Sequence, residues 1–236
     1  TLMRSSAASD VYKRQAAYPP GKGDITNMIR SYIHRCQKDG VKIVMNCEVT
    51  PELIKEEKPD SVIIATGSKT LILPIEGIDN PAIIHGSDLL DGKRAAGKKV
   101  LVVGGGMVGC ETAAFLGEQE HDVTVIEFRD TVGADVIHEH RVYLMKDFED
   151  YGIKEITGAK VCKFYEDGVE YETADGVRHE SRGYDSVILS MGFRNYNPLE
   201  EKIKDLVPET HVIGDAIRAR RALDATKEAY DVASQI

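Results

Sequence analysis

The stretch Lys98-Lys-Val-Leu-Val-Val-Gly-Gly-Gly-Met-Val-Gly109 decides the fold. Its apolar run from Val100 to Val103 is typical of a strand that is buried on both faces of a parallel sheet. Three glycines then predict a turn, and the segment Met107 to Glu120 predicts a helix. Residues Asp122 to Glu127 predict the next strand. The segment therefore predicts a β-α-β unit.

The glycines of this turn satisfy the pattern GxGxxG, which alone is weak evidence because glycine-rich turns are common. Here the motif follows an apolar strand, opens a helix and precedes Glu127 by about 20 residues, as a dinucleotide-binding fingerprint requires. Gly104 is expected to make the tight turn, Gly106 to let a pyrophosphate approach the backbone, and Gly109 to let the helix pack closely. The amides at the helix N-terminus and the helix dipole favour the negative charge of a pyrophosphate. The predicted pyrophosphate-binding residues are Gly104, Gly105, Gly106, Met107, Val108 and Gly109.

Glu127, at the end of the second strand, is the candidate ligand of the adenosine ribose. Its carboxylate can accept hydrogen bonds from both ribose hydroxyls, whereas a 2′-phosphate would meet a like charge. The residue therefore favours NAD(H) over NADP(H), and Arg129, two residues later, weakens that preference. A tight turn without a ligand and a methyltransferase, which also uses a glycine turn and a ribose-binding acid, remain alternatives.

The rest of the chain alternates helices and strands, which predicts an α/β fold with a parallel sheet. The elements expected around the central unit are a helix from Ile25 that stops at Gly40, a strand over Val41 to Val49, a short helix opening at Thr50-Pro51, a buried strand from Asp60 to Gly67, a connection from Pro74 to Gly92, a helix from Ala134 to Tyr151, strands at Ile153 to Thr157 and Asp185 to Ser190, and a β-meander from Lys160 to Ser181 with a hairpin turn at Asp175-Gly176. We infer two α/β domains, one interrupted by the other.

Composition excludes several functional classes. The formal charge of −9 would repel a nucleic-acid backbone, and no apolar run approaches the roughly 20 residues of a membrane span. The N-terminus lacks the apolar core of a secretory signal. The arginines at 218, 220 and 221 are expected to form a solvated face or helix-end contacts, and an anion site is the alternative. We expect a cytoplasmic protein with no nucleic-acid or membrane partner.

Cysteine and histidine spacing favours no metal site. The four cysteines stand far apart, so neither a zinc ribbon nor a redox pair can be drawn, and Cys110 is expected to be a small packing residue. His138 and His140 are two positions apart on an expected helix, do not share a face, and are expected at the surface. The cysteines are Cys36, Cys47, Cys110 and Cys162.

Three further strings stand at strand ends: Ala65-Thr66-Gly67, Ser190-Met191-Gly192 and His211-Val-Ile-Gly214-Asp215. Together with Gly104-Gly-Gly-Met-Val-Gly-Cys-Glu111, they resemble the flavoproteins that carry two dinucleotide-binding domains. In that family the Ala-Thr-Gly strand links the domains. The resemblance implies that Gly214 and Asp215 are FAD ligands, that Glu111 lies near the nicotinamide, and that Gly192 lets the chain pass close to NADH. The residue-based alternative for Glu111 is an acid in the first helical turn that complements the dipole.

From about Ala16 onward the chain resembles more closely the C-terminal half of the NADH:flavin oxidoreductases of the old-yellow-enzyme type, which include 2,4-dienoyl-CoA reductase, enoate reductases and bile-acid reductases. The matching strings are Tyr18-Pro-Pro-Gly-Lys, Val49-Thr-Pro-Glu-Leu, Pro59-Asp-Ser-Val-Ile-Ile-Ala-Thr-Gly and Gly97-Lys-Lys-Val. The resemblance implies a fragment that lacks the FMN barrel, the cysteines of a 4Fe-4S cluster and the first FAD-binding βαβ. Residues Ser5 to Gln15 resemble translated sequencing-adapter read-through.

The expected fold is therefore a Rossmann-like NAD(P)-binding domain with a β-meander, residues 96–196, inserted in a truncated FAD-binding α/β domain, residues 16–95 and 197–236, after a non-native-looking tail, residues 1–15. The implied function is hydride transfer from NADH to FAD, as the electron-input module of an enzyme that reduces a small molecule or CoA ester. We expect weak NADH affinity, little bound flavin, no substrate turnover and no catalytic side chain in the isolated chain. The alternatives are an NADH-binding module without redox activity and another FAD-dependent NAD(P)H oxidoreductase.

Overall fold

The computed structural model describes residues 2–4, 17, 19 and 22–236, and it divides into two compact units. Unit 1 comprises Thr1–Lys13, Asn27–Leu71 and Phe193–Ile236, and unit 2 comprises Arg14–Thr26 and Ile72–Gly192. One unit thus interrupts the other in sequence. The finer domain boundaries expected at residues 96 and 196 stay a prediction, and the adapter-like Ser5 to Gln15 lies outside the described residues.

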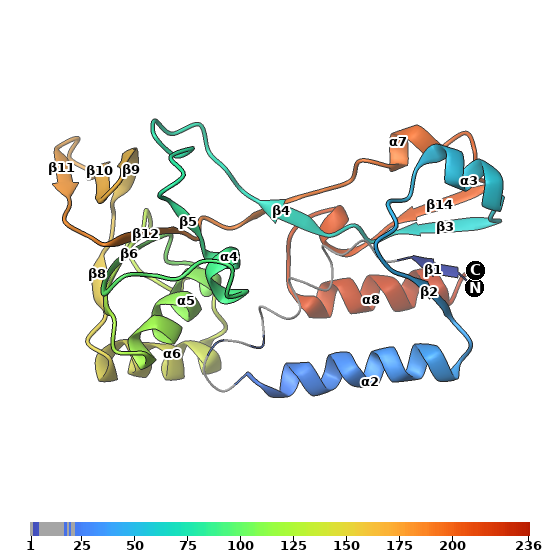
Figure 1. The fold of residues 1–236 in the computed structure, drawn as a ribbon, viewed down its shortest axis with the longest axis horizontal. Coiled ribbons are helices and arrows are strands. Elements are labelled where there is room, and N and C mark those ends of the chain that lie inside the picture. The colour runs from blue at the N-terminus through green and yellow to red at the C-terminus, as the bar shows by residue number, and fades with distance from the viewer. Residues whose placement is uncertain (1, 5–16, 18, 20–21) are drawn as a thin grey trace. The chain divides into compact units, whose positions relative to one another are not determined.

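Unit 2 is built on a five-stranded sheet in which all paired strands are parallel (Figure 1). The strand order is β5-β12-β6-β7-β8, so the strand latest in sequence lies between two early ones. The expected α/β class with a Rossmann-like parallel sheet is confirmed. The strands are β5 (Ile84–His85), β6 (Lys99–Val103), β7 (Asp122–Ile126), β8 (Lys154–Ile156) and β12 (Ser186–Leu189), and the helices are α4 (Gly86–Leu90), α5 (Met107–Glu118) and α6 (His138–Asp150).

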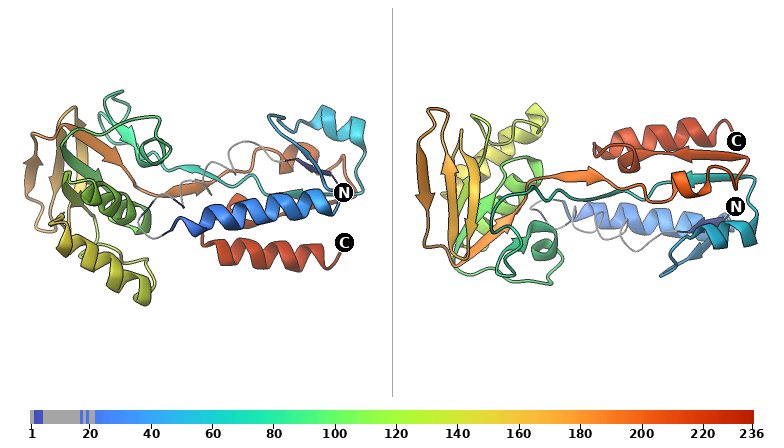
Figure 2. Two further views of the ribbon diagram at one scale, coloured as in Figure 1. Left: turned by 60° about the horizontal axis from the view of Figure 1, so that its bottom comes forward. Right: turned by 90° about the horizontal axis from the view of Figure 1, so that it is seen from above.

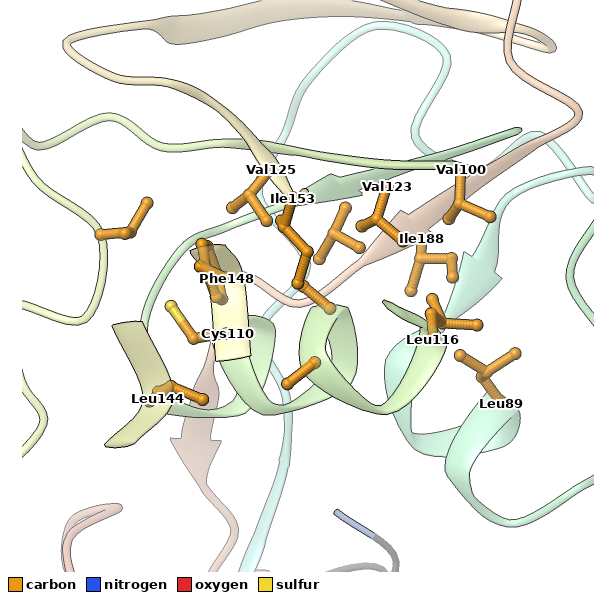
Figure 3. Packing of buried hydrophobic residues seen from close by; sticks show 14 of the residues in the cluster. Leu89, Val100, Cys110, Leu116, Val123, Val125, Leu144, Phe148, Ile153 and Ile188 are labelled. Atoms are coloured by element: carbon orange, nitrogen blue, oxygen red, sulfur yellow. The ribbon is translucent and has the colours of Figure 1, made fainter. Parts of the chain in front are cut away.

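Strand β6 is buried on both faces because its side chains alternate between two apolar clusters. Val100 and Val102 belong to a cluster with residues of α5. Figure 3 shows Val100 in this cluster with Cys110 and Leu116. The intervening Leu101 and Val103 belong to the cluster on the opposite face. The uninterrupted apolar run seen in the sequence is therefore explained by a sheet covered on both sides.

The second face of this sheet is covered by the β-meander and not by helices (Figure 2). Its strands β9 (Lys160–Tyr165), β10 (Gly168–Glu172) and β11 (Arg178–Ser181) pair antiparallel in sequence order. Phe164 and Val169 point into the same cluster as Leu101. The meander and its Asp175-Gly176 hairpin are confirmed, and the meander closes the second apolar cluster of unit 2 with Phe164 and Val169.

Within its described residues, unit 1 contains three two-stranded sheets. Thr50 accepts the amide hydrogen of Leu53 at 3.3 Å and Pro51 opens a helix, as the sequence predicts. The strand pairs are β1 (Leu2–Arg4) with β2 (Lys42–Val44), β3 (Ser61–Ile64) with β14 (Glu209–Val212), and β4 (Ser68–Thr70) with β13 (Phe193–Asn195); the helical segments are α2 (Asp24–Lys38, which begins in unit 2), α3 (Pro51–Glu57), α7 (Glu200–Ile203), η1 (Gly214–Ala216) and α8 (Ala222–Ala233).

The described core of unit 1 is small. One cluster joins Ile54, Ile64, Ile203 and three further buried residues, whereas α2 and α8 have no buried residue. Strand β3 was expected to be buried, and this holds only in part, because Ile64 is 2 % exposed whereas Ile63 is 43 % exposed. In this structure the two-stranded sheet leaves that side chain of β3 open to solvent.

Several expected boundaries are also corrected. Helix α6 begins at His138 and not at Ala134, because residues 131–136 form a loop that is bonded to the glycine turn. The strand expected over Val41 to Val49 is shortened to β2, and Leu2–Arg4, in the expected tail, pairs with it. Among the described helices, none is both long enough and apolar enough to cross a membrane.

Candidate functional site

The glycine-rich turn lies at the carboxyl end of β6, between β12 and β7. The chain runs from β6 to β7 on one side and returns to β12 on the other, so the turn stands at the topological switch point where open α/β sheets bind ligands. Gly104 has φ +104°, and a Cβ there would overlap the carbonyl oxygen of Ser190. A Cβ at Gly109 would overlap the carbonyl oxygen of Gly104. Both positions therefore require glycine.

The carboxylate of Glu127 is fixed beside this turn. One oxygen accepts the amide hydrogen of Gly105 at 2.5 Å, and the other accepts that of Arg129 at 2.9 Å. A carboxylate has about four acceptor positions, so two remain for other donors. The side chain of Glu127 is half-buried, and its carboxylate can accept a pair of hydroxyl groups without reorienting.

The N-terminus of α5 carries a carboxylate that the sequence did not reveal. Gly106 is the N-cap residue and offers no side chain, and the amide of Met107 donates to Oδ1 of Asp135 at 3.0 Å. At the sequence level Asp135 was expected inside a helix. Its position in the loop before α6 could have been inferred only from how that loop packs.

Glu111 is buried in the second turn of α5 and is only 6 % exposed. Its carboxylate pairs with the Lys22 ammonium, and His140 Nε2 lies 3.8 Å from the same oxygen. The alternative of a first-turn acid is wrong, because the first turn of α5 has no acidic residue. A buried carboxylate requires such a counter-charge to remain ionised. Lys22 and His140 were not assigned this role from the sequence; His138 is exposed as expected, whereas His140 is half-buried.

Cys110 follows the turn and is fully buried. Its thiol donates to the Gly105 carbonyl oxygen at 3.2 Å, and burial raises the pKa of the Cys110 thiol to about 12. A thiol that stays protonated is a poor nucleophile. The packing role expected for this residue is therefore supported. All four cysteines are free thiols in the structure.

In unit 1, the Ala65-Thr66-Gly67 string links β3 to β4 and is bonded to the residues after β13. The Thr66 hydroxyl donates to the Tyr196 carbonyl oxygen, and the Tyr196 amide donates to the Gly67 carbonyl oxygen at 3.0 Å. Ala65 is exposed. These bonds join the two strands that connect the two units in sequence.

The Gly214-Asp215 turn follows β14, and Asp215 is bonded on both oxygens. Ser68 Oγ donates to one at 3.3 Å, and the Arg220 amide donates to the other at 3.0 Å. The Gly214 amide donates to Glu228 at 2.7 Å, and Glu228 also pairs with the Arg220 guanidinium, which holds the pKa of Glu228 below its usual range. Asp215 retains acceptor positions for the hydroxyls of a ribityl chain.

The arginines at 218, 220 and 221 do not form one anion site: Arg220 is engaged by Glu228, and Arg221 is the N-cap residue of α8. Gly192 follows β12 with open space where a Cβ would stand. Across the described residues, no group of three or more His, Cys, Asp or Glu side chains is placed to hold a metal ion. The candidate residues thus fall into two sets, one in each unit: the first comprises Gly104, Gly105, Gly106, Met107, Val108, Gly109, Glu111, Glu127, Arg129 and Gly192, and the second comprises Ala65, Thr66, Gly67, Gly214 and Asp215.

Known proteins match most of this chain. The family model described as "Pyridine nucleotide-disulphide oxidoreductase" matches residues 6–213. The cinnamate reductase of Clostridium sporogenes is 29% identical over 92% of this chain, and the NADH oxidase of Thermoanaerobacter brockii is 32% identical over 94%. The solved structure of a 2-naphthoyl-CoA reductase complex superposes with a TM-score of 0.89 at 30% identity and covers 100% of this chain.

The chain spans about a third of the length of these proteins: 33% of the cinnamate reductase, 35% of the NADH oxidase and 35% of the naphthoyl-CoA reductase chain. The family model covers far more than half of this chain, and it coincides with the parallel sheet and the glycine-rich turn. Members of the family are NAD(P)H-dependent flavin oxidoreductases, which separates this chain from the methyltransferases. The chain belongs to the pyridine nucleotide-disulphide oxidoreductase family.

Proposed function

We propose that unit 2 binds NADH with its pyrophosphate on the turn Gly104 to Gly109 and its adenosine ribose on Glu127. The turn provides backbone amides at the N-terminus of α5, where an anion is stabilised by the helix dipole. Arg129 contributes its amide to the orientation of Glu127. NADPH is the weaker ligand in this proposal, because its 2′-phosphate would meet the Glu127 carboxylate.

The orientation of Glu127 is the observation that carries this proposal. A carboxylate held by the Gly105 and Arg129 amides lies directly beside the turn that receives the pyrophosphate. The alternative, a structural turn with no ligand, explains the glycines equally well. It does not explain why a partly exposed carboxylate at a strand end is kept in one orientation with acceptor positions to spare.

We infer further that unit 1 contributes to an FAD site through Gly214 and Asp215, next to the Ala65-Thr66-Gly67 string. The residues fit such a group, since Asp215 keeps acceptor capacity and its position is set by Ser68 and Arg220. When both cofactors are bound, the nicotinamide supplies a hydride and the flavin accepts it. The side chains of this chain bind and orient, and none is proposed to be catalytic.

Glu111 is proposed to orient the nicotinamide end of NADH, with Lys22 holding its carboxylate in place. The Lys22 ammonium pairs with this buried carboxylate and His140 Nε2 lies beside it, so the position of the acceptor oxygens is fixed. Gly192, with open space above it, would let the nicotinamide pass close to the backbone. This arrangement needs no cysteine pair.

In the whole protein we propose that this module passes electrons toward the reduction of an enoate or an aromatic or dienoyl CoA ester. The support is the likeness to a cinnamate reductase and to a naphthoyl-CoA reductase. FMN and a 4Fe-4S cluster would be held outside the present chain. A reducing, cytoplasmic setting agrees with four free thiols.

Calorimetric titration of the purified chain with NADH, NADPH and S-adenosylmethionine tests the nucleotide site. We expect NADH to bind about tenfold more tightly than NADPH, with no binding of S-adenosylmethionine. In Glu127→Ala, NADH affinity should fall about tenfold, because charge-assisted hydrogen bonds are lost, and the preference over NADPH should shrink. The matched control is Glu118→Gln, an exposed acid at the opposite end of α5.

Equal NADH affinity in the wild type and in Glu127→Ala would contradict the ribose assignment. Titration with FAD under the same conditions addresses unit 1, and we expect weak binding that dialysis removes. NADH binding without any reduction of added FAD would favour the alternative of a binding module without redox activity.

A further inference from the structure

Asp135 lies where the bound pyrophosphate is expected. Its Oδ1 accepts the amide hydrogen of Met107, the first residue of α5, at 3.0 Å. A Cβ built on Gly106 would stand 3.3 Å from Oδ2 of the same carboxylate. The carboxylate therefore lies over the glycine whose missing side chain leaves room for the ligand. It makes the kind of contact that a phosphate oxygen makes at a helix N-terminus.

The loop that carries Asp135 is anchored independently of this carboxylate. Val132 and Val136 are buried, and the Gly133 amide donates to the Gly105 carbonyl oxygen at 2.7 Å. Arg141 donates to Thr131 Oγ1 at 2.8 Å and to the Val132 carbonyl oxygen at 3.1 Å. The loop is thus bonded to the glycine turn at Gly133, and a buried valine packs in the core on each side of Asp135.

The side chain of Asp135, in contrast, is exposed. Rotation about its side-chain bonds would move the carboxylate into solvent while the loop stays in place. A carboxylate and a diphosphate at the same amide repel each other, so both cannot occupy this position. Rotation of the Asp135 side chain away from the Met107 amide is the change that requires the least rearrangement of the structure.

We propose that Asp135 is a displaceable internal ligand of the pyrophosphate site, and that a nucleotide diphosphate must expel it in order to bind. The inference rests on the proposed dinucleotide site of unit 2. Asp135 then sets the affinity of the site: it satisfies the helix N-terminus in the free chain, opposes the charge of the entering diphosphate, and promotes its release. A ligand without phosphate groups is not opposed in this way.

Calorimetric titration of the whole chain with ADP, NADH and adenosine, in wild type and Asp135→Asn, tests the proposal. Asparagine keeps an oxygen that can accept the Met107 amide hydrogen but removes the charge. We expect ADP and NADH to bind about tenfold more tightly to the variant, with adenosine affinity unchanged. The control Asp130→Asn removes the same charge from the same loop, beside Gly158, and should leave all three affinities near the wild-type values.

A second readout follows the displacement directly. In ¹⁵N-labelled wild-type chain, ADP should shift the amide resonance of Met107, since its hydrogen-bond acceptor changes from a carboxylate to a phosphate. If the wild type binds NADH but Asp135→Asn binds ADP no more tightly than the wild type, the proposed role of Asp135 is wrong and the dinucleotide site stands. Absence of ADP and NADH binding in both proteins would overturn the dinucleotide site and, with it, this inference.

Discussion

Units 1 and 2 both alternate strands with helices, yet they differ in how far their strands are covered. In unit 2, β6 lies between neighbours and between two apolar clusters, and its residues Val100 to Val103 are at most 2 % exposed. In unit 1, β3 has one partner strand, and Ile63 is largely open to solvent. A run of β-branched residues therefore gives a closed core only where the sheet is wide enough to be covered twice.

The helices show the same difference. Eight residues of α5 are buried, whereas α2 and α8 bury none, and Tyr32, Leu223 and Tyr230 are more than half exposed. Most of the stability of a helix in a protein comes from tertiary packing of its apolar face. We therefore expect unit 2 to be the more stable unit, and substitutions in both units test this comparison.

The largest effect is expected at the two glycine turns, one in each unit. Gly109→Ala should prevent unit 2 from folding correctly or destabilise it by more than about 4 kcal/mol, because the added methyl overlaps a backbone carbonyl oxygen that cannot move aside. Gly214→Ala in unit 1 should cost about 1–2 kcal/mol, because φ is +61° and the new Cβ lies 3.1 Å from that of Ala225. Chemical denaturation measures both, and similar losses would contradict the contrast.

The next effect concerns two fully buried side chains. Leu101→Ala in β6 should destabilise unit 2 by about 3–4 kcal/mol, since the neighbours on a doubly covered sheet cannot collapse into the cavity. Ile203→Ala in α7 should cost unit 1 nearer to 2 kcal/mol, the low end of such substitutions, because its smaller cluster can relax. If Ile203→Ala proved the more damaging, unit 1 would have the tighter core.

These outcomes also show which parts of the molecule a sequence can predict. The unit from β6 to β7 was predicted within two residues, because strand, turn, helix and acid are encoded by neighbouring residues whose patterns agree. The meander was predicted for the same reason. The roles of Gly104 and Gly109 follow from local geometry, and the structure supports them.

Features that depend on distant residues were not predicted. Strands β4 and β13 are short and pair with each other, although most of unit 2 lies between them in the sequence. Neither strand can therefore be recognised without its partner. The Lys22 contact to Glu111 and the Asp135 contact to Met107 join residues that no periodicity links. The loop before α6 is bonded to the glycine turn through Gly133, a contact between segments that the helical pattern expected from Ala134 does not reveal.

The smallest expected effect is a pH dependence at Cys110. The folded thiol has a pKa of about 12, whereas the unfolded thiol titrates near 9. Above pH 9 the unfolded chain therefore loses a proton that the folded chain retains, and stability falls as the pH rises from 9 toward 12, by about 1 kcal/mol at pH 10. Unfolding curves of the wild type and Cys110→Ala at pH 8 and pH 10 should show this difference.

The rate at which cysteines react with an alkylating reagent also distinguishes the two units. Iodoacetamide should modify Cys47 of unit 1, which is only half-buried, well before Cys110 of unit 2. If stability depended on pH in the same way in the wild type and in Cys110→Ala, the prediction for the buried thiol would be wrong. Rapid labelling of Cys110 would show that unit 2 opens readily.

The position of β12 between β5 and β6 has a consequence for synthesis on the ribosome. Strand β6 can pair with β7 once both have emerged. Its other edge stays unpaired until β12, Ser186–Leu189, has been synthesised, and β5 has no other partner in the described sheet. The nascent chain must therefore hold an open sheet edge while the whole meander is translated. Only then can the glycine-rich turn acquire the Ser190 backbone against which Gly104 packs.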